Sequence, residues 1–142
     1  MFFSFFAFFF PALLFGQITF QRTYGGDSTD VANEVLQTLD GGYIIGGSTN
    51  SFGAGGFDVY VIKTDSTGDT LWTKTFGGTG NDYGNSIQST NDGGYIIAGQ
   101  TNSFGVGLYD VYLLKIDANG NLQWSKTYGN ALDNMGYSVK QT

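Results

Sequence analysis

The stretch Asp92-Gly-Gly-Tyr-Ile-Ile97 decides the fold of this chain, because it already occurs once as Asp40-Gly-Gly-Tyr-Ile-Ile45. The two copies lie 52 residues apart, and the residues around them return at the same spacing without a gap. A repeat of this length is typical of proteins in which each unit buries its faces only against its neighbours. The chain is therefore a tandem repeat.

Each repeat begins with a threonine, an aromatic residue and a glycine. These segments start at Thr23, Thr75 and Thr127, so the repeats span 23–74, 75–126 and, in part, 127–142. The chain also begins and ends within a unit. Ile18–Tyr24 matches the last strand of a repeat without its tryptophan, and Ser138–Thr142 matches a first strand.

Four strands are predicted in each period, separated by turns rich in Gly, Asn and Asp. In the second repeat they span 85–90, 95–101, 110–116 and 122–128. No stretch carries apolar residues at helical spacing, so we expect an all-β protein with nearly no helix. The second and third strands are apolar on both sides, and both faces of the sheet must therefore be covered.

A four-stranded antiparallel sheet with two covered faces is typical of a β-propeller blade. We therefore expect an incomplete β-propeller, with about two full blades plus flanking strands. The alternative is a β-sandwich, but independent sandwich strands would not recur at a fixed period. Because closure takes about four to eight blades, further blades are expected in a longer chain or from self-association.

The first sixteen residues are almost wholly apolar, and a small Gly16 precedes Gln17. This pattern predicts a signal peptide over residues 1–16, although no Lys or Arg precedes the apolar run. A membrane-tethering segment and a misassigned start are the alternatives. About 125 residues remain after its removal, and no later stretch resembles a membrane span. The expected location is extracellular or at the cell surface.

Composition excludes several classes of function. The chain has no cysteine and no histidine, which excludes disulfides, thiol catalysis, Ser-His-Asp catalysis and metal sites built on these residues. Its formal charge is −6 with six basic residues, which argues against nucleic acid as a partner. No cofactor and no metal are expected.

The repeated segments Asp-Gly-Gly-Tyr-Ile-Ile and Thr-Asn-Ser-Phe-Gly, with Asp117-Ala-Asn-Gly-Asn-Leu-Gln-Trp124, resemble the secreted β-propeller repeat proteins of Bacteroidetes and related bacteria. The likeness covers nearly all of 18–142. It implies export and a propeller fold, often in large proteins with a C-terminal sorting domain. The fourth hairpin also distantly resembles the tryptophan-docking repeat of quinoproteins. The spacing from Asp117 to Gly120 is one residue shorter than in that motif, so a quinone cofactor is not implied.

The candidate site residues lie in or beside the loops that follow the second strands. Asp58 and Asp110 end these loops, and a pair of carboxylates could do acid-base work. They are equivalent positions of successive repeats, however, so each is expected to bond backbone N–H groups of its own turn. The remaining candidates face either a ligand or the gap between blades, and packing is the favoured interpretation. These residues are Asn50, Phe52, Asn102 and Phe104.

Three other features have a structural and a functional interpretation. The segments 65–69 and 117–121 look like calcium loops but lack the distal glutamate, so hairpin turns are expected. Trp72 and Trp124 are expected to pack between blades rather than to stack on sugars. Lysines at four strand positions are expected to be solvated or to pair with aspartates: Lys63, Lys74, Lys115 and Lys126.

Taken together, the sequence predicts a non-catalytic exported scaffold or binding module whose partner is a glycan or a surface protein. The alternative is the propeller part of a larger secreted enzyme whose active site lies outside this segment. A cofactor-dependent propeller enzyme would need charged and aromatic groups that converge on the central channel, and the six basic residues here recur too regularly to suggest such a site. This favours the non-catalytic interpretation.

Overall fold

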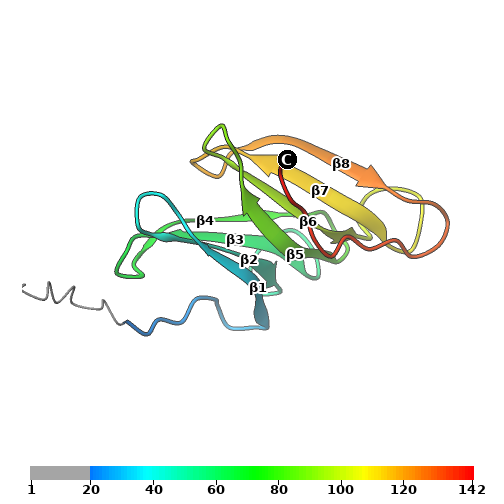
Figure 1. Ribbon diagram of the computed structural model, residues 1–142. Coiled ribbons are helices and arrows are strands. Elements are labelled where there is room, and N and C mark those ends of the chain that lie inside the picture. Colours follow the sequence, from blue (N-terminus) through cyan, green and yellow to red (C-terminus); the bar gives the residue numbers. More distant parts are fainter. Residues whose placement is uncertain (1–19) are drawn as a thin grey trace, which may run out of the picture.

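The computed structural model describes residues 20–142, which form two four-stranded antiparallel sheets and contain no helix (Figure 1). The first sheet comprises β1 (Asp30–Gln37), β2 (Tyr43–Thr49), β3 (Asp58–Thr64) and β4 (Thr70–Phe76). The second comprises β5 (Asp82–Ser89), β6 (Tyr95–Thr101), β7 (Asp110–Ile116) and β8 (Leu122–Tyr128). The predicted signal peptide, 1–16, lies outside the described residues. No helix among the described residues is long and apolar enough to cross a membrane.

Three of the four strands predicted in the second repeat have the predicted bounds, and the all-β expectation is confirmed. The prediction for the first strand, 85–90, was wrong at its start, because β5 begins at Asp82. The ladder shifts register between Gly84 and Ser86, so Asn85 is the extra residue of a β-bulge. A bulge interrupts the alternation of side chains, so β5 begins several residues before the alternating pattern of the sequence does.

The hairpin turns have the chemistry that the sequence predicts. Gly41 and Gly93 adopt φ values of 81° and 82°, a left-handed conformation that favours glycine. The preceding aspartates accept hydrogen bonds within the same turns, from Gly42 N to Asp40 Oδ1 at 3.0 Å and from Gly94 N to Asp92 Oδ1 at 3.1 Å. These contacts fix the hairpins β1–β2 and β5–β6.

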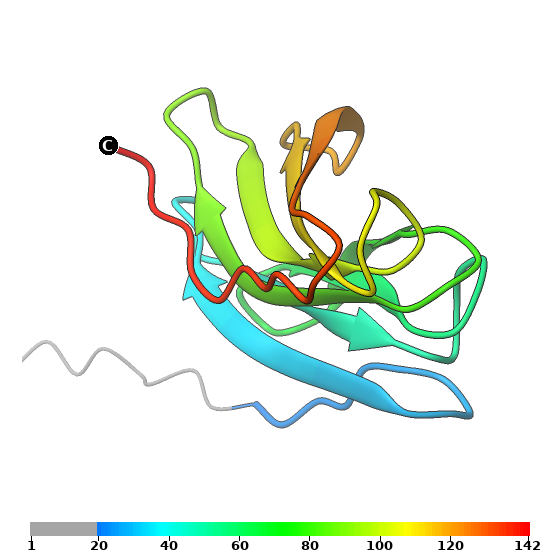
Figure 2. The ribbon, with the colours of Figure 1, turned by 90° about the vertical axis from the view of Figure 1, so that its right-hand side faces the viewer.

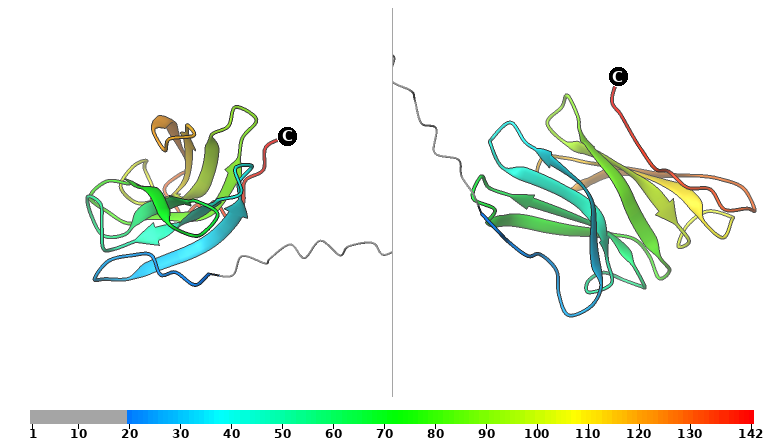
Figure 3. Two further views of the ribbon diagram at one scale, coloured as in Figure 1. Left: turned by 90° about the vertical axis from the view of Figure 1, so that its left-hand side faces the viewer. Right: turned by 60° about the horizontal axis from the view of Figure 1, so that its bottom comes forward.

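The two sheets lie face to face, and β5 contacts β1, β2 and β3 (Figures 2 and 3). Ile44 of β2 with Val59 and Val61 of β3 is buried in one cluster with second-sheet residues such as Ile97 and Leu114. Glycine makes room for the closest approach. A Cβ on Gly46 would lie 2.9 Å from Cγ2 of Ile87.

A polar seam also joins the sheets. The carboxylate of Glu34 accepts a hydrogen bond from Ile87 N at 2.7 Å, and Asn33 Nδ2 donates to Gly84 O at 2.7 Å. Asn33 is the extra residue at the register shift of β1, so the bulge directs its amide across to the other sheet. Bulges thus position the residues that connect successive repeats.

The last residues of the chain run along the second sheet in the same way as β5 runs along the first sheet (Figure 2). Asn85 Nδ2 donates to Gly136 O at 2.9 Å, as Asn33 does to Gly84, and Val139 N donates to Ser86 Oγ at 3.3 Å. The expected strand over 138–142 is not formed. Within residues 20–142, no strand pairs with this segment to form a ladder.

The start of the described chain takes the place of a fourth strand without forming one. Phe20 occupies the repeat position of Trp72, and its ring lies 5.6 Å from that of Tyr43. Trp72 likewise lies 6.5 Å from Tyr95 of the second sheet, as expected for inter-repeat packing. Tyr24 donates its hydroxyl to Gly68 O at 2.8 Å. Residues 18 and 19 of the predicted match lie outside the described residues.

Two of the four lysines are not solvated. Lys63 and Lys115 are buried, and their ammonium groups pair with Asp40 at 2.8 Å and Asp92 at 3.0 Å. Each ammonium also donates to a backbone carbonyl, that of Thr64 or Ile116. At these two positions the expected pairing with aspartates is confirmed, and the ammonium groups are buried rather than solvated.

Candidate functional site

The sequence-predicted site residues gather at one end of each sheet but form no common pocket. Asp58 and Asp110 are buried at the starts of β3 and β7, one repeat apart. Each carboxylate accepts backbone N–H groups of its own loop, from Ala54 at 3.0 Å to Asp58 and from Val106 at 2.8 Å to Asp110. These bonds are those of turn-capping aspartates, and the two carboxylates are not brought together.

The two candidate phenylalanines lie in the loops after β2 and β6, which we call the rim loops, and each packs one face of its ring. Phe52 is 46% exposed and Phe104 is 44% exposed. Phe52 contacts Tyr60 at a centroid distance of 5.8 Å, and Phe104 contacts Tyr112 at 5.7 Å. Both partners belong to the same repeat as the phenylalanine. The rings therefore pack on their own sheets, with nearly half of each ring residue accessible.

The candidate asparagines are exposed, and their backbones connect the loops to the segments before β1 and β5. Asn50 N donates to Thr29 O at 2.9 Å, and Asn102 N donates to Asn81 O at 3.0 Å. The side chain of Asn102 also accepts a hydrogen bond from Asn81 N at 2.5 Å. These bonds hold each loop, with its phenylalanine, against the segment before β1 or β5.

A second pair of carboxylates, Asp58 and Asp82, was not anticipated from the sequence. A Cβ on Gly77 would lie 2.1 Å from Asp58 Oδ1 and 2.6 Å from Asp82 Oδ2. Burial raises the pKa of the Asp58 carboxyl, and the charge of Asp82 raises it further. Asp82 Oδ2 accepts hydrogen bonds from Gly78 N and Ser103 Oγ, while its fully buried Oδ1 has no hydrogen-bond partner among the described residues.

The next repeat contains an equivalent arrangement in which one carboxylate is replaced by an amide. At the next junction, Gly129 takes the place of Gly77, Asp110 that of Asp58, and Asn134 that of Asp82. A Cβ on Gly129 would lie 1.7 Å from Asp110 Oδ1 and 3.1 Å from Asn134 Nδ2. The second junction thus carries an amide where the first carries a carboxylate.

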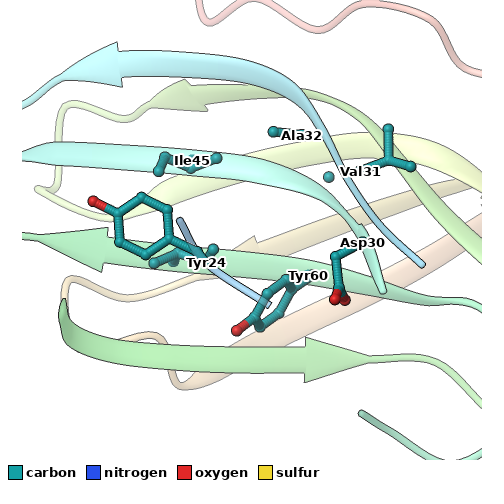
Figure 4. A pocket seen from close by; sticks show the side chains of 8 residues that line it. Tyr24, Asp30, Val31, Ala32, Ile45 and Tyr60 are labelled. Atoms are coloured by element: carbon teal, nitrogen blue, oxygen red, sulfur yellow. The ribbon is translucent and has the colours of Figure 1, made fainter. Parts of the chain in front are cut away.

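A pocket of about 240 Å³ opens on the outward face of the first sheet (Figure 4). Its lining combines the tyrosines Tyr24 and Tyr60 with Asp30 and aliphatic side chains such as Ile45 and Ile62. Burial alone would raise the pKa of Asp30, but hydrogen bonds from Thr49, Gly26 and Ser51 outweigh it and lower the pKa. Apart from the repeat itself, no feature of the sequence indicated this pocket.

The segments that look like calcium loops are hairpin turns. Asp65 Oδ1 accepts hydrogen bonds from Thr67 N at 2.8 Å and Asp69 N at 2.9 Å. Asp117 does the same with Asn119 and Asn121. Within residues 20–142, no three acidic side chains converge as a metal site would require.

Comparison with known proteins adds no family: no protein-family model matches the chain, and no curated protein sequence matches it. The functional argument therefore rests on the geometry. Asp58, Asp82 and Asp110 are engaged in turns and junctions, whereas the rings of Phe52 and Phe104 are accessible.

Proposed function

We propose that the chain is a non-catalytic, exported β-propeller scaffold or binding module. The observation that carries the proposal is the repetition of one set of junction contacts. Asn33 and Glu34 connect the first sheet to β5, and Asn85 and Ser86 connect the second sheet to 136–139 in the same way. The same set of contacts therefore relates each repeat to the one that follows it.

Repeated application of this relation favours a propeller over an isolated sandwich. β5 lies beside β1 as well as across the first sheet, so the first strands of successive sheets are neighbours. In a propeller, the first strands of all blades line the central channel, and about four to eight blades close the ring. The two sheets described here correspond to two such blades.

The proposed partner is a glycan or a surface protein, which binds at the rim. Phe52 and Phe104 present half-exposed rings at the same end of successive sheets, each beside an exposed asparagine amide. Aromatic rings stack on the apolar faces of sugars, and amides bond their hydroxyls. Equivalent rings one repeat apart suit a partner that itself repeats, such as an oligosaccharide.

A glycan array probed with the full chain tests the binding proposal. The double variant with Phe52→Ala and Phe104→Ala should lose binding, while Leu39→Ala should keep it. Leu39 is a fully exposed leucine in the β1–β2 turn, away from the rim loops. Binding that is equal in all three proteins would contradict a rim site.

Export is tested separately. A reporter fused after Thr142 should be secreted from a bacterial host, and N-terminal sequencing of the secreted product should begin at Gln17. Deletion of 2–16 should keep the reporter inside the cell. Secretion without residues 2–16 would contradict the proposed signal peptide.

A further inference from the structure

Equivalent positions of the two repeats differ systematically in exposure. Val35 of β1 is 58% exposed, while Ile87, its equivalent in β5, is fully buried against the first sheet. On the other side of the molecule, Tyr128 of β8 is 55% exposed, while its equivalent Phe76 packs against the core. Each sheet therefore has one face that the other sheet covers and one outward face that it does not.

The two outward faces differ from each other. Each consists of residues equivalent to one side of the interface between the two sheets. The first outward face belongs to the first sheet and consists of Val35, Tyr43, Ile45, Tyr60 and Ile62, of which Tyr60 and Ile62 are already buried within the single chain. The second outward face belongs to the second sheet and consists of Ile96, Val111, Leu113, Trp124 and Tyr128. The strand registers place Val35 beside Ile45 and Val111 beside Tyr128 on these faces.

Inside the chain, the equivalents of these two faces pack together. Ile44, Val59 and Val61 match the second outward face, and Ile87, Ile97 and Tyr112 match the first. All six are buried in one cluster. The interface between the sheets thus shows how the second outward face of one molecule fits the first outward face of another.

We propose that the first outward face, with its 240 Å³ pocket, binds the second outward face of another copy of this chain, head to tail. Because the two faces are different, the contact is heterologous and extends into a ring or an open chain of copies. The inference rests on the proposed function in one respect, the stacking of successive repeats. It does not depend on the rim loops.

Two strips of chain partly occupy the outward faces. Phe20–Tyr24 lies where β4 of a preceding repeat would lie, and 134–142 lies where β1 of a following repeat would lie. The pocket of 240 Å³ lies beside the first strip, between Tyr24 and the side chains of Ile45 and Tyr60. A second copy supplies a whole sheet in this place. Its β8 replaces the strip 20–24, and its own strip 134–142 yields to β1 of the first copy.

Two variants that each alter one outward face test the proposal. Val35→Asp alters the first, and Tyr128→Lys alters the second; both side chains are more than half exposed, so the separate molecules should fold. Sedimentation velocity over a concentration series should show multiples of the 15.3 kDa chain, less any signal peptide removed, for the wild type and single copies for each variant. Leu39→Asp and Leu39→Lys carry the same charges outside both faces and should associate as the wild type does.

Mixing the two variants is decisive, because each retains the face that the other has lost. An equimolar mixture should form a heterodimer and nothing larger. The proposal is overturned by a wild type that stays monomeric, by a variant that associates as the wild type does, or by a mixture without heterodimer. Glycan binding by the same variants separates the two proposals, since a change at an outward face leaves Phe52 and Phe104 intact.

Discussion

Asp58 and Asp82 bring two buried carboxylates together at the junction of the sheets. Asp58 begins β3 and Asp82 begins β5, and Gly77 leaves the space in which their oxygens meet. None of the three ion pairs within residues 20–142 includes either residue. Burial, together with the charge of the adjacent Asp82, raises the pKa of the Asp58 carboxyl.

We expect Asp82→Asn to stabilise the protein at pH 7, by on the order of 1 kcal/mol. The amide oxygen keeps the bonds from Gly78 N and Ser103 Oγ, and the amide nitrogen replaces the oxygen that has no partner. A raised folded-state pKa means that Asp58 contributes fully below its ordinary pKa of 3.8 and that this contribution is lost as pH rises through the folded-state value. The advantage of the variant should therefore be small near pH 3.5 and grow toward pH 7, as measured by urea unfolding.

The reciprocal variant Asn134→Asp serves as the control for this prediction. It places a second carboxylate beside Asp110, at the junction where the chain carries an amide. We expect a loss of stability at pH 7 that diminishes in acid. A gain in stability from Asn134→Asp, or a loss from Asp82→Asn, would show that charge repulsion does not govern these junctions.

Burial against the first sheet distinguishes Ile87 from Val35. Because Ile87 is fully buried opposite Gly46, Ile87→Ala should lower the free energy of unfolding by about 2–4 kcal/mol. Val35→Ala, at the equivalent and largely exposed position, should change it by less than about 0.5 kcal/mol when measured below the concentration of any association. Equal effects in denaturant unfolding would contradict the packing of the two sheets.

The ion pair between Asp40 and Lys63 predicts a loss of stability in acid. Hydrogen bonds from Lys63, then Thr38 and Gly42 N, hold the pKa of Asp40 well below its ordinary value. The contribution of Asp40 is therefore present above its unfolded-state pKa and is lost as pH falls through the folded-state value. Because this carboxylate is about half exposed, Asp40→Asn should cost only about 0.5–1 kcal/mol at pH 7.

Thermal unfolding at several pH values measures this effect. The difference between Asp40→Asn and the wild type should shrink below pH 3. Asp27→Asn is the matched control, because Asp27 is exposed and belongs to no ion pair among the described residues. A difference that persists undiminished in strong acid would assign the loss to the turn geometry rather than to the charge.

The strands and hairpins were predictable from the sequence because they are determined locally. Short runs of apolar residues bounded by turns rich in Gly, Asn and Asp define β6, β7 and β8, and the turn glycines have the expected positive φ. The start of β5 was not predictable, since a bulge breaks the alternation at Gly84. The repeat spacing could have located this start, because Asp82 matches Asp30 at the start of β1.

The junctions were not predictable because they join residues far apart in the chain. Nothing local indicates that the charged Lys63 is buried or that Asp58 meets Asp82, about half a repeat later. Among the candidate site residues, the turn-capping role of Asp58 and Asp110 followed from their position, whereas the pocket beside Tyr24 and Tyr60 depends on how the sheets and strips pack. Long-range packing therefore determines the surfaces that are free to bind.

The two tryptophans provide a direct measure of which sheet face is covered. Trp72 packs against Tyr95 beneath the β7–β8 turn, whereas Trp124 is 39% exposed on the second outward face. Since these are the only tryptophans, Trp124→Phe and Trp72→Phe each leave one emitter. At low concentration, the protein that retains Trp72 should emit at shorter wavelength and be quenched less by acrylamide. The protein that retains Trp124 should become better protected as its concentration rises, because a second copy covers this face; quenching independent of concentration would contradict that contact.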